Sequence, residues 1–167
     1  MNAVDILKYG HLTVLQTLDG FPESAWDTPG ACGTWSVKDI IAHLASNELV
    51  LVDVLTTLRG SAPTPVLDRF LELRGQFNDT EVSSRKEQTI KEVLGEYNDT
   101  HAQVMSMVAQ LSSETLHQNG TLPWYGEVYA LDDFLVYAYY VWAQTRTQRP
   151  DCRVSRPVVV IWAASAG

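Results

Sequence analysis

The sequence lacks most of the features that would assign a protein to a class at once. It has only two cysteines, Cys32 and Cys152, and their unpatterned positions make a weak case for a zinc site or a catalytic thiol. Residues 1–9 have neither the basic nor the apolar region of a secretion signal. The longest apolar run, residues 158–164, is far shorter than the roughly 20 residues that span a bilayer. We therefore expect a cytoplasmic protein with no membrane partner.

Positive charge is also scarce. The chain has 12 Lys and Arg against 20 Asp and Glu, a net charge of -8. Because such a surface repels a phosphate backbone, we expect no nucleic-acid partner. The glycines are scattered and none follows a predicted strand, so no phosphate-binding loop is expected. With 167 residues, 46% of them hydrophobic, the chain is long enough for one domain with a buried core.

Hydrophobic periodicity predicts four long helices, over residues 2–18, 37–58, 87–111 and about 132–148. Ser36, followed three residues later by Asp39, resembles a capping box at the start of the second helix. A shorter, less regular helix is expected within residues 66–77, and a loop over 112–129. Because no strand pattern or repeat competes, the sequence predicts an all-α bundle of four helices over residues 1–148, followed by an irregular tail at 149–167.

The four histidines are the first candidates for chemistry. His43 shares a flank of its helix with Asn47 and faces another helix, so a metal or catalytic role is geometrically open. A hydrogen-bonded core histidine is the alternative, and both interpretations apply equally to His101 and His11. His117 lies in a polar loop, where we expect it to be solvated. No His-x-x-x-His or similar metal-binding spacing occurs.

Aromatic residues crowd the fourth predicted helix and the loop before it. They are Trp124, Tyr125, Tyr129, Tyr137, Tyr139, Tyr140 and Trp142. This group either forms the wall of a small-molecule pocket at one end of the bundle or belongs to the ordinary core.

Residues 35–45, which read Trp-Ser-Val-Lys-Asp-Ile-Ile-Ala-His-Leu-Ala, resemble the second-helix signature of the DinB-like superfamily, which includes the ClbS/DfsB group and thiol-dependent transferases and isomerases. Pro-Trp-Tyr-Gly at 123–126 and Leu-Asp-Asp-Phe-Leu-Val-Tyr at 131–137 extend the resemblance to about Tyr140. The resemblance implies an up-and-down four-helix bundle. It also implies a divalent metal, zinc or nickel, held by three histidines: one from the second helix and two, four residues apart, from the fourth. His43 matches the first of these ligands.

The sequence departs from the superfamily after Tyr140. Where relatives read Gly-His-Lys-Arg-Glu-His, this chain reads Val-Trp-Ala-Gln-Thr-Arg at residues 141–146, so the other two histidine ligands are missing. Neither Trp nor the always-charged Arg can replace a neutral imidazole.

A change of reading frame offers one explanation of this departure. In a frame shifted by one base, the codons of residues 142–148 can encode the missing Gly-His-Lys-Arg-Glu-His, provided that Ala143 and Thr147 both have A at the third position. We hypothesise that the residues after about Tyr140 are a frameshifted tail. The alternative is a divergent, metal-free member of the superfamily.

The function implied by the resemblance is that of a metal-dependent small-molecule hydrolase or thiol transferase, in which the metal lowers the pKa of bound water or thiol. Because the three-histidine site is incomplete, we expect that activity to be impaired; a chain that binds no metal at all is the other expectation.

The alternative function is that of a non-catalytic bundle that binds a small apolar or aromatic molecule or associates with itself. Homodimers are common among such relatives. The expected site residues are His43 as metal ligand and, lining a pocket, Asn47, Tyr97, His101, Trp124 and Trp142.

Overall fold

The computed structural model describes residues 2–60 and 63–138, and these residues form helices joined by loops. The α-helices are α1 (Ala3–Leu18), α2 (Val37–Thr57), α3 (Pro65–Leu73), α4 (Phe77–Ser84), α5 (Ile90–Val108) and α6 (Ser113–His117), with residues 131–138 also helical. Two 3-10 segments, η1 (Glu23–Ala25) and η2 (Arg74–Gln76), complete the order. Within these ranges the structure has no named strand, and the all-α prediction is confirmed.

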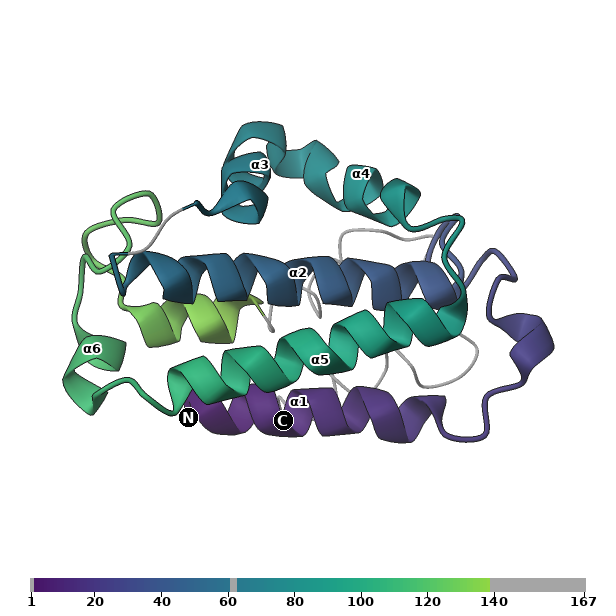
Figure 1. The fold of residues 1–167 in the computed structure, drawn as a ribbon, viewed down its shortest axis with the longest axis horizontal. Helices are drawn as coiled ribbons and strands as arrows, with labels where there is room; N and C mark the ends of the chain where they lie inside the picture. Colours follow the sequence, from purple (N-terminus) through teal and green to yellow (C-terminus); the bar gives the residue numbers. More distant parts are fainter. Residues whose placement is uncertain (1, 61–62, 139–167) are drawn as a thin grey trace.

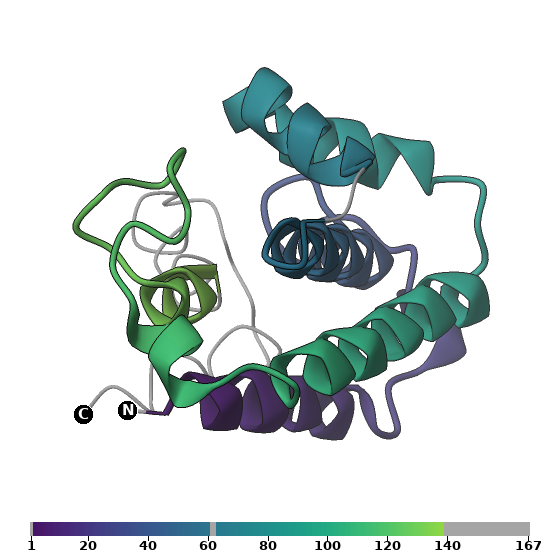
Figure 2. The same cartoon turned by 60° about the vertical axis from the view of Figure 1, so that its left-hand side comes forward.

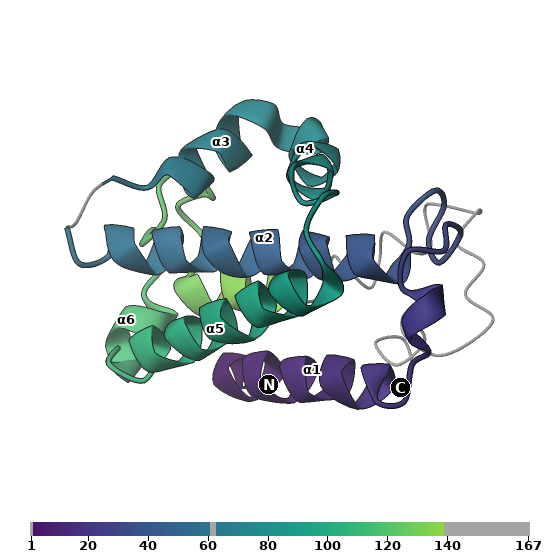
Figure 3. The same cartoon turned by 45° about the vertical axis from the view of Figure 1, so that its right-hand side comes forward.

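The long helix α2 lies at the centre of the molecule, between α5 on one side and α3 and α4 on the other (Figures 1 and 2). Helix α1 packs along α5, and residues 131–138 lie beside α2 in both views. Helices α2 and α5 run in the same direction because the α3–α4 connection carries the chain back to its starting end (Figure 3). The predicted helical bundle is thus confirmed, with one parallel pair created by this long crossover.

Two helix starts are defined by capping boxes. At the start of α2, the Ser36 backbone N–H donates to Asp39 Oδ2 at 2.9 Å and the Asp39 N–H donates to Ser36 Oγ at 3.2 Å, as the sequence predicted. At the start of α5, the Thr89 N–H donates to Glu92 Oε2 at 2.7 Å. This second box places the helix start three residues later than predicted, because it satisfies the backbone N–H groups of Thr89 and Glu92.

Of two predictions about the connecting segments, one is confirmed and one is wrong. The short helix expected within residues 66–77 is α3 (Pro65–Leu73), which ends where Arg74 adopts a positive φ of 47°, and a separate helix, α4, begins at Phe77. Residues 112–129 are not all loop, because they include α6 (Ser113–His117), whose N-cap Ser112 accepts from the Thr115 N–H. A helix as short as α6 shows too few turns for a periodic pattern to be recognised in the sequence.

Helix α2 is long and apolar enough to cross a membrane by length and composition alone, yet 72% of the relevant window is buried inside the protein. Its apolar residues contribute to two core clusters, one that includes Leu51 and one that includes Ile41. It also buries polar side chains, among them Glu48, which is fully buried. In this fold α2 is therefore the central core helix.

Buried ion pairs fix α4 against α5. The Arg85 guanidinium, 7% exposed, donates two hydrogen bonds to Glu96 at 2.8 Å each and one to Glu81 Oε2 at 3.0 Å. Glu81, 6% exposed, also accepts from Arg69 on α3 at 2.9 Å. These paired charges join α3 to α4 and the end of α4 to α5.

Candidate functional site

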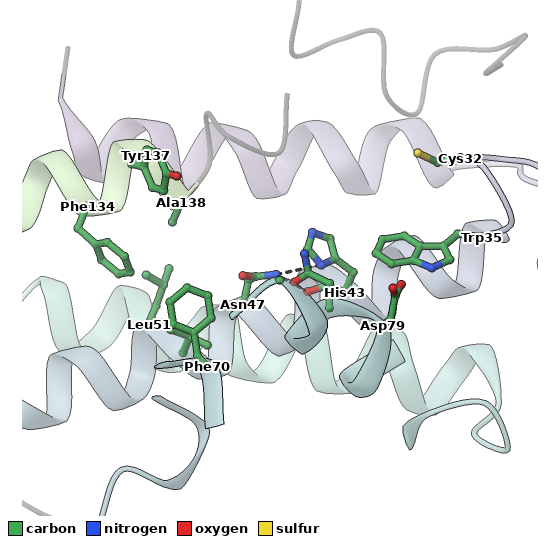
Figure 4. Close-up of a pocket in the computed structure, with 13 residues that line it drawn as sticks. Cys32, Trp35, His43, Asn47, Leu51, Phe70, Asp79, Phe134, Tyr137 and Ala138 are labelled. Carbon is green, nitrogen blue, oxygen red and sulfur yellow. Dashed lines mark hydrogen bonds between the residues drawn. The ribbon is translucent and has the colours of Figure 1, made fainter. Parts of the chain in front are cut away.

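A pocket of about 280 Å³ lies between α2, the α3–α4 segment and helical residues 131–138 (Figure 4). One part of its lining is polar and the other is apolar. The polar residues are His43 and Asn47 from α2 and Asn78 and Asp79 from α4. The remaining lining residues are Cys32, Trp35, Val50, Leu51, Phe70, Gly75, Phe134, Tyr137 and Ala138.

His43 is held at the polar part by its neighbours on α2 and α4. The Asn47 Nδ2 atom lies 2.8 Å from the His43 carbonyl oxygen and 3.1 Å from His43 Nδ1 (Figure 4). Because a carbonyl only accepts, the Asn47 atom facing it must be the NH₂ group, and Nδ1 must accept from the same group. The ring proton is therefore on Nε2. Trp35 lies beside the imidazole, with 5.4 Å between ring centroids.

The environment of His43 keeps the imidazole neutral. Burial lowers its pKa to about 4, because the packed surroundings desolvate the imidazolium, and a hydrogen bond with the Asn78 side chain offsets only part of this effect. At neutral pH the ring is thus an uncharged hydrogen-bonding group within the pocket.

Asp79 is the one charged side chain among the described residues that line the pocket. It is exposed on α4, and no hydrogen bond or ion pair engages its carboxylate within the described part of the chain. Figure 4 shows this carboxylate directed toward the side of the pocket that holds His43 and Trp35. The polar part of the pocket therefore combines a neutral imidazole with an unneutralised negative charge.

His101 forms a separate buried group with residues from three helices. Its Nδ1 lies 3.0 Å from Glu48 Oε1, and its ring stacks on His11 with 3.9 Å between centroids and 3° between planes. His11 Nε2 in turn lies 2.9 Å from Asn98 Oδ1. Burial and the neighbouring His101 lower the pKa of His11. Neither histidine is among the described lining of the pocket, and this group joins α1, α2 and α5 in the core.

The other expected pocket residues lie in different places. Tyr97 is fully buried and packs against His11 at 4.8 Å. Trp124 packs edge-on against Phe134 at 5.2 Å, so it supports a residue of the pocket without lining it. Trp142 lies outside the described residues, as do the predicted tail and the proposed frameshift. Of the expected set, the structure brings together His43 and Asn47.

Several lining residues were not proposed from the sequence. Asp79 and Phe70 belong to the α3–α4 segment, whose position over α2 has no signature in hydrophobic periodicity. Trp35 belongs to the motif at 35–45. Its position immediately before the Ser36 cap is the sequence signal for its place in the pocket, because a residue there lies at the end of the bundle.

Comparison with known proteins agrees with this helical architecture. A family model described as the DinB superfamily matches residues 11–140, more than three quarters of the chain. This chain belongs to the DinB superfamily. A search of curated proteins and a search of solved structures each returned no match. The superfamily match ends at the same point as the resemblance seen in the sequence, shortly after the described residues.

The DinB superfamily is often metal-binding, and the residues of this chain can be tested against that property. The full sequence has no histidine after His117, so a three-histidine site that includes His43 and two ligands from the last helix cannot form. No group of three His, Cys, Asp or Glu side chains in residues 2–60 and 63–138 is arranged to hold a metal ion. In addition, a metal-binding histidine usually donates its other N–H to an acceptor, whereas His43 Nδ1 accepts from Asn47. The described residues therefore do not fit a metal site with three histidine ligands.

Proposed function

We propose that this DinB-superfamily protein binds a small organic molecule in the pocket between α2, the α3–α4 segment and residues 131–138. The observation that carries the proposal is a concave site of about 280 Å³ with separate polar and apolar linings. Ligand pockets are typically apolar with a few convergent polar groups, and this volume lies just below their usual range of about 300–1,000 Å³. The ligand is accordingly a small molecule with one polar end.

The apolar and the polar residues of the pocket contribute differently to binding. Phe70, Leu51 and Phe134 contribute apolar surface, which favours burial of a hydrocarbon or aromatic body. Asn47 contributes its side-chain oxygen, an acceptor that orients the polar end, because its NH₂ group is engaged by His43. The neutral ring of His43 holds the Asn47 side chain in this orientation, since Nδ1 accepts from the Asn47 NH₂ group.

Metal-dependent hydrolysis or thiol transfer is a second candidate. It is supported by the position of His43, which matches the superfamily ligand of the second helix and lines the pocket. The incomplete ligand set argues that such activity is impaired in this chain.

Self-association is also compatible with the fold, because Tyr129 and Tyr137 are about half exposed, at 48% and 49%.

Filling the pocket should abolish binding. We expect the neutral probe 3-phenylpropan-1-ol to shift the indole N–H resonance of Trp35 saturably in the wild-type protein. Ala138→Phe, which places a ring at the lining, should remove this response. Ala102→Phe is the matched control, since Ala102 is exposed on α5 and is not among the described lining residues. A probe that still saturates the Trp35 signal in Ala138→Phe would contradict the proposal.

A metal measurement separates the two candidate functions. After equilibration of the purified protein with zinc or nickel, we expect far less than one metal ion per chain, and no difference between wild type, His43→Ala and the exposed-site control His117→Ala. The reason is that one imidazole is an insufficient ligand set. Near-stoichiometric metal that is lost only in His43→Ala would overturn this expectation and favour the metal-dependent enzyme.

A further inference from the structure

The charge of the pocket selects among the organic molecules that fit it. Asp79 contributes a carboxylate that no Lys or Arg neutralises within the described residues, and no cationic side chain is among the described lining. The whole chain carries a net charge of -8, which adds a negative long-range field. An anionic group entering this pocket would therefore meet repulsion without a compensating partner.

Aromatic rings near the carboxylate favour the opposite charge. Trp35 lies on the His43 side of the pocket, and Tyr137 lines it from the last described helix (Figure 4). The face of an aromatic ring attracts a cation, most strongly in Trp. A carboxylate, which accepts hydrogen bonds and carries a negative charge, and an indole ring together form a pair of groups suited to an ammonium ion, which donates hydrogen bonds and carries a positive charge.

We infer that the pocket recognises an organic ammonium group attached to a small apolar or aromatic body, with Asp79 as the residue that determines charge specificity. This inference rests on the proposed binding function and names the chemical class of its ligand. In this arrangement, the ammonium group lies near Asp79 and Trp35, and the apolar body extends toward Leu51, Phe70 and Phe134.

The expected selectivity is moderate because Asp79 is exposed to solvent. An exposed ion pair changes affinity by a factor of up to about five, and an anion in the same place loses a similar factor by repulsion. We therefore expect an amine to bind about tenfold more tightly than a carboxylate with the same body, with the neutral alcohol between them.

Three probes with one phenylpropyl body test this order by isothermal titration calorimetry on the full chain: 3-phenylpropylamine, 3-phenylpropan-1-ol and 3-phenylpropanoate. The Trp35 indole N–H resonance locates each probe in the pocket. Asp79→Asn should weaken binding of the amine by about threefold to fivefold, strengthen binding of the carboxylate, and change binding of the alcohol less than that of either charged probe. Asp68→Asn is the matched control, since it removes the same charge from an exposed position on α3 outside the described lining.

The outcomes distinguish the inference from the proposed function. An alcohol or carboxylate that binds as tightly as the amine, or an amine preference that survives in Asp79→Asn, would overturn the inference while pocket binding stands. An equal loss in Asp68→Asn would also overturn it, because the preference would then reflect overall charge. If none of the three probes binds in the pocket, the proposed function fails, and the inference fails with it.

Discussion

Replacing Arg85 by Met is expected to lower the free energy of unfolding by about 3 kcal/mol, because the change breaks a buried network of charges. The side chain is 7% exposed and donates to both Glu96 and Glu81. Methionine keeps most of the apolar volume of the side chain. The carboxylate of Glu81, which is 6% exposed, then keeps only one of its two partners, Arg69. A buried charge that loses its main partner destabilises the folded state more than removal of both charges does.

Arg69→Met provides the matched comparison for this prediction. Arg69 binds the same carboxylate at 2.9 Å, but its side chain is 45% exposed, so we expect a loss below about 1 kcal/mol. Urea unfolding at neutral pH measures both variants. Equal losses, or a loss below about 1 kcal/mol for Arg85→Met, would show that burial does not distinguish the two arginines.

The Arg85 network also bears on the pocket. Arg85 joins α4 to α5, and α4 carries Asn78 and Asp79 at the polar part of the lining. Under conditions where Arg85→Met remains folded, a displaced α4 would weaken the amine probe more than the alcohol, since only the amine depends on Asp79.

Acidification is expected to destabilise the protein through His43, by about 2 kcal/mol between about pH 7.5 and about pH 4.5. The folded-state pKa is about 4, below the ordinary value of 6.5, because burial disfavours the charged ring. The unfolded chain therefore takes up a proton before the folded chain does. The stability contributed by the neutral ring is complete above about pH 6.5 and decreases as the pH falls toward 4.

His43→Gln tests this prediction, because glutamine keeps hydrogen-bonding capacity but does not titrate in this range. Unfolding free energies of the variant should fall less steeply with acid than those of wild type. A smaller decline should remain, since His11 also has a lowered pKa. His117→Gln, at an exposed position, should retain the full wild-type slope. An unchanged slope in His43→Gln would contradict the assignment of this pH dependence to His43.

Local sequence determined the long helices of this protein. The stripe in residues 37–58 and the Ser36–Asp39 box predicted the start and the length of α2 closely, because capping hydrogen bonds and hydrophobic periodicity act within a few residues. The position of His43 on an inward flank of α2 followed from the same periodicity. The motif at 35–45 indicated the superfamily for the same reason, since its residues are contiguous.

The tertiary structure decided which of the candidate residues meet. The sequence placed His43, His101 and Tyr97 in one expected site, but the fold directs His101 and Tyr97 toward His11 and leaves His43 in the pocket. The contribution of Asp79 depends on the crossover that lays α4 over α2. Periodicity fixes only which face of a helix is buried; the neighbour of that face depends on packing between segments distant in the chain. For this reason the sequence alone determined the helices and the superfamily, and only the packed structure determined the pocket and its charge.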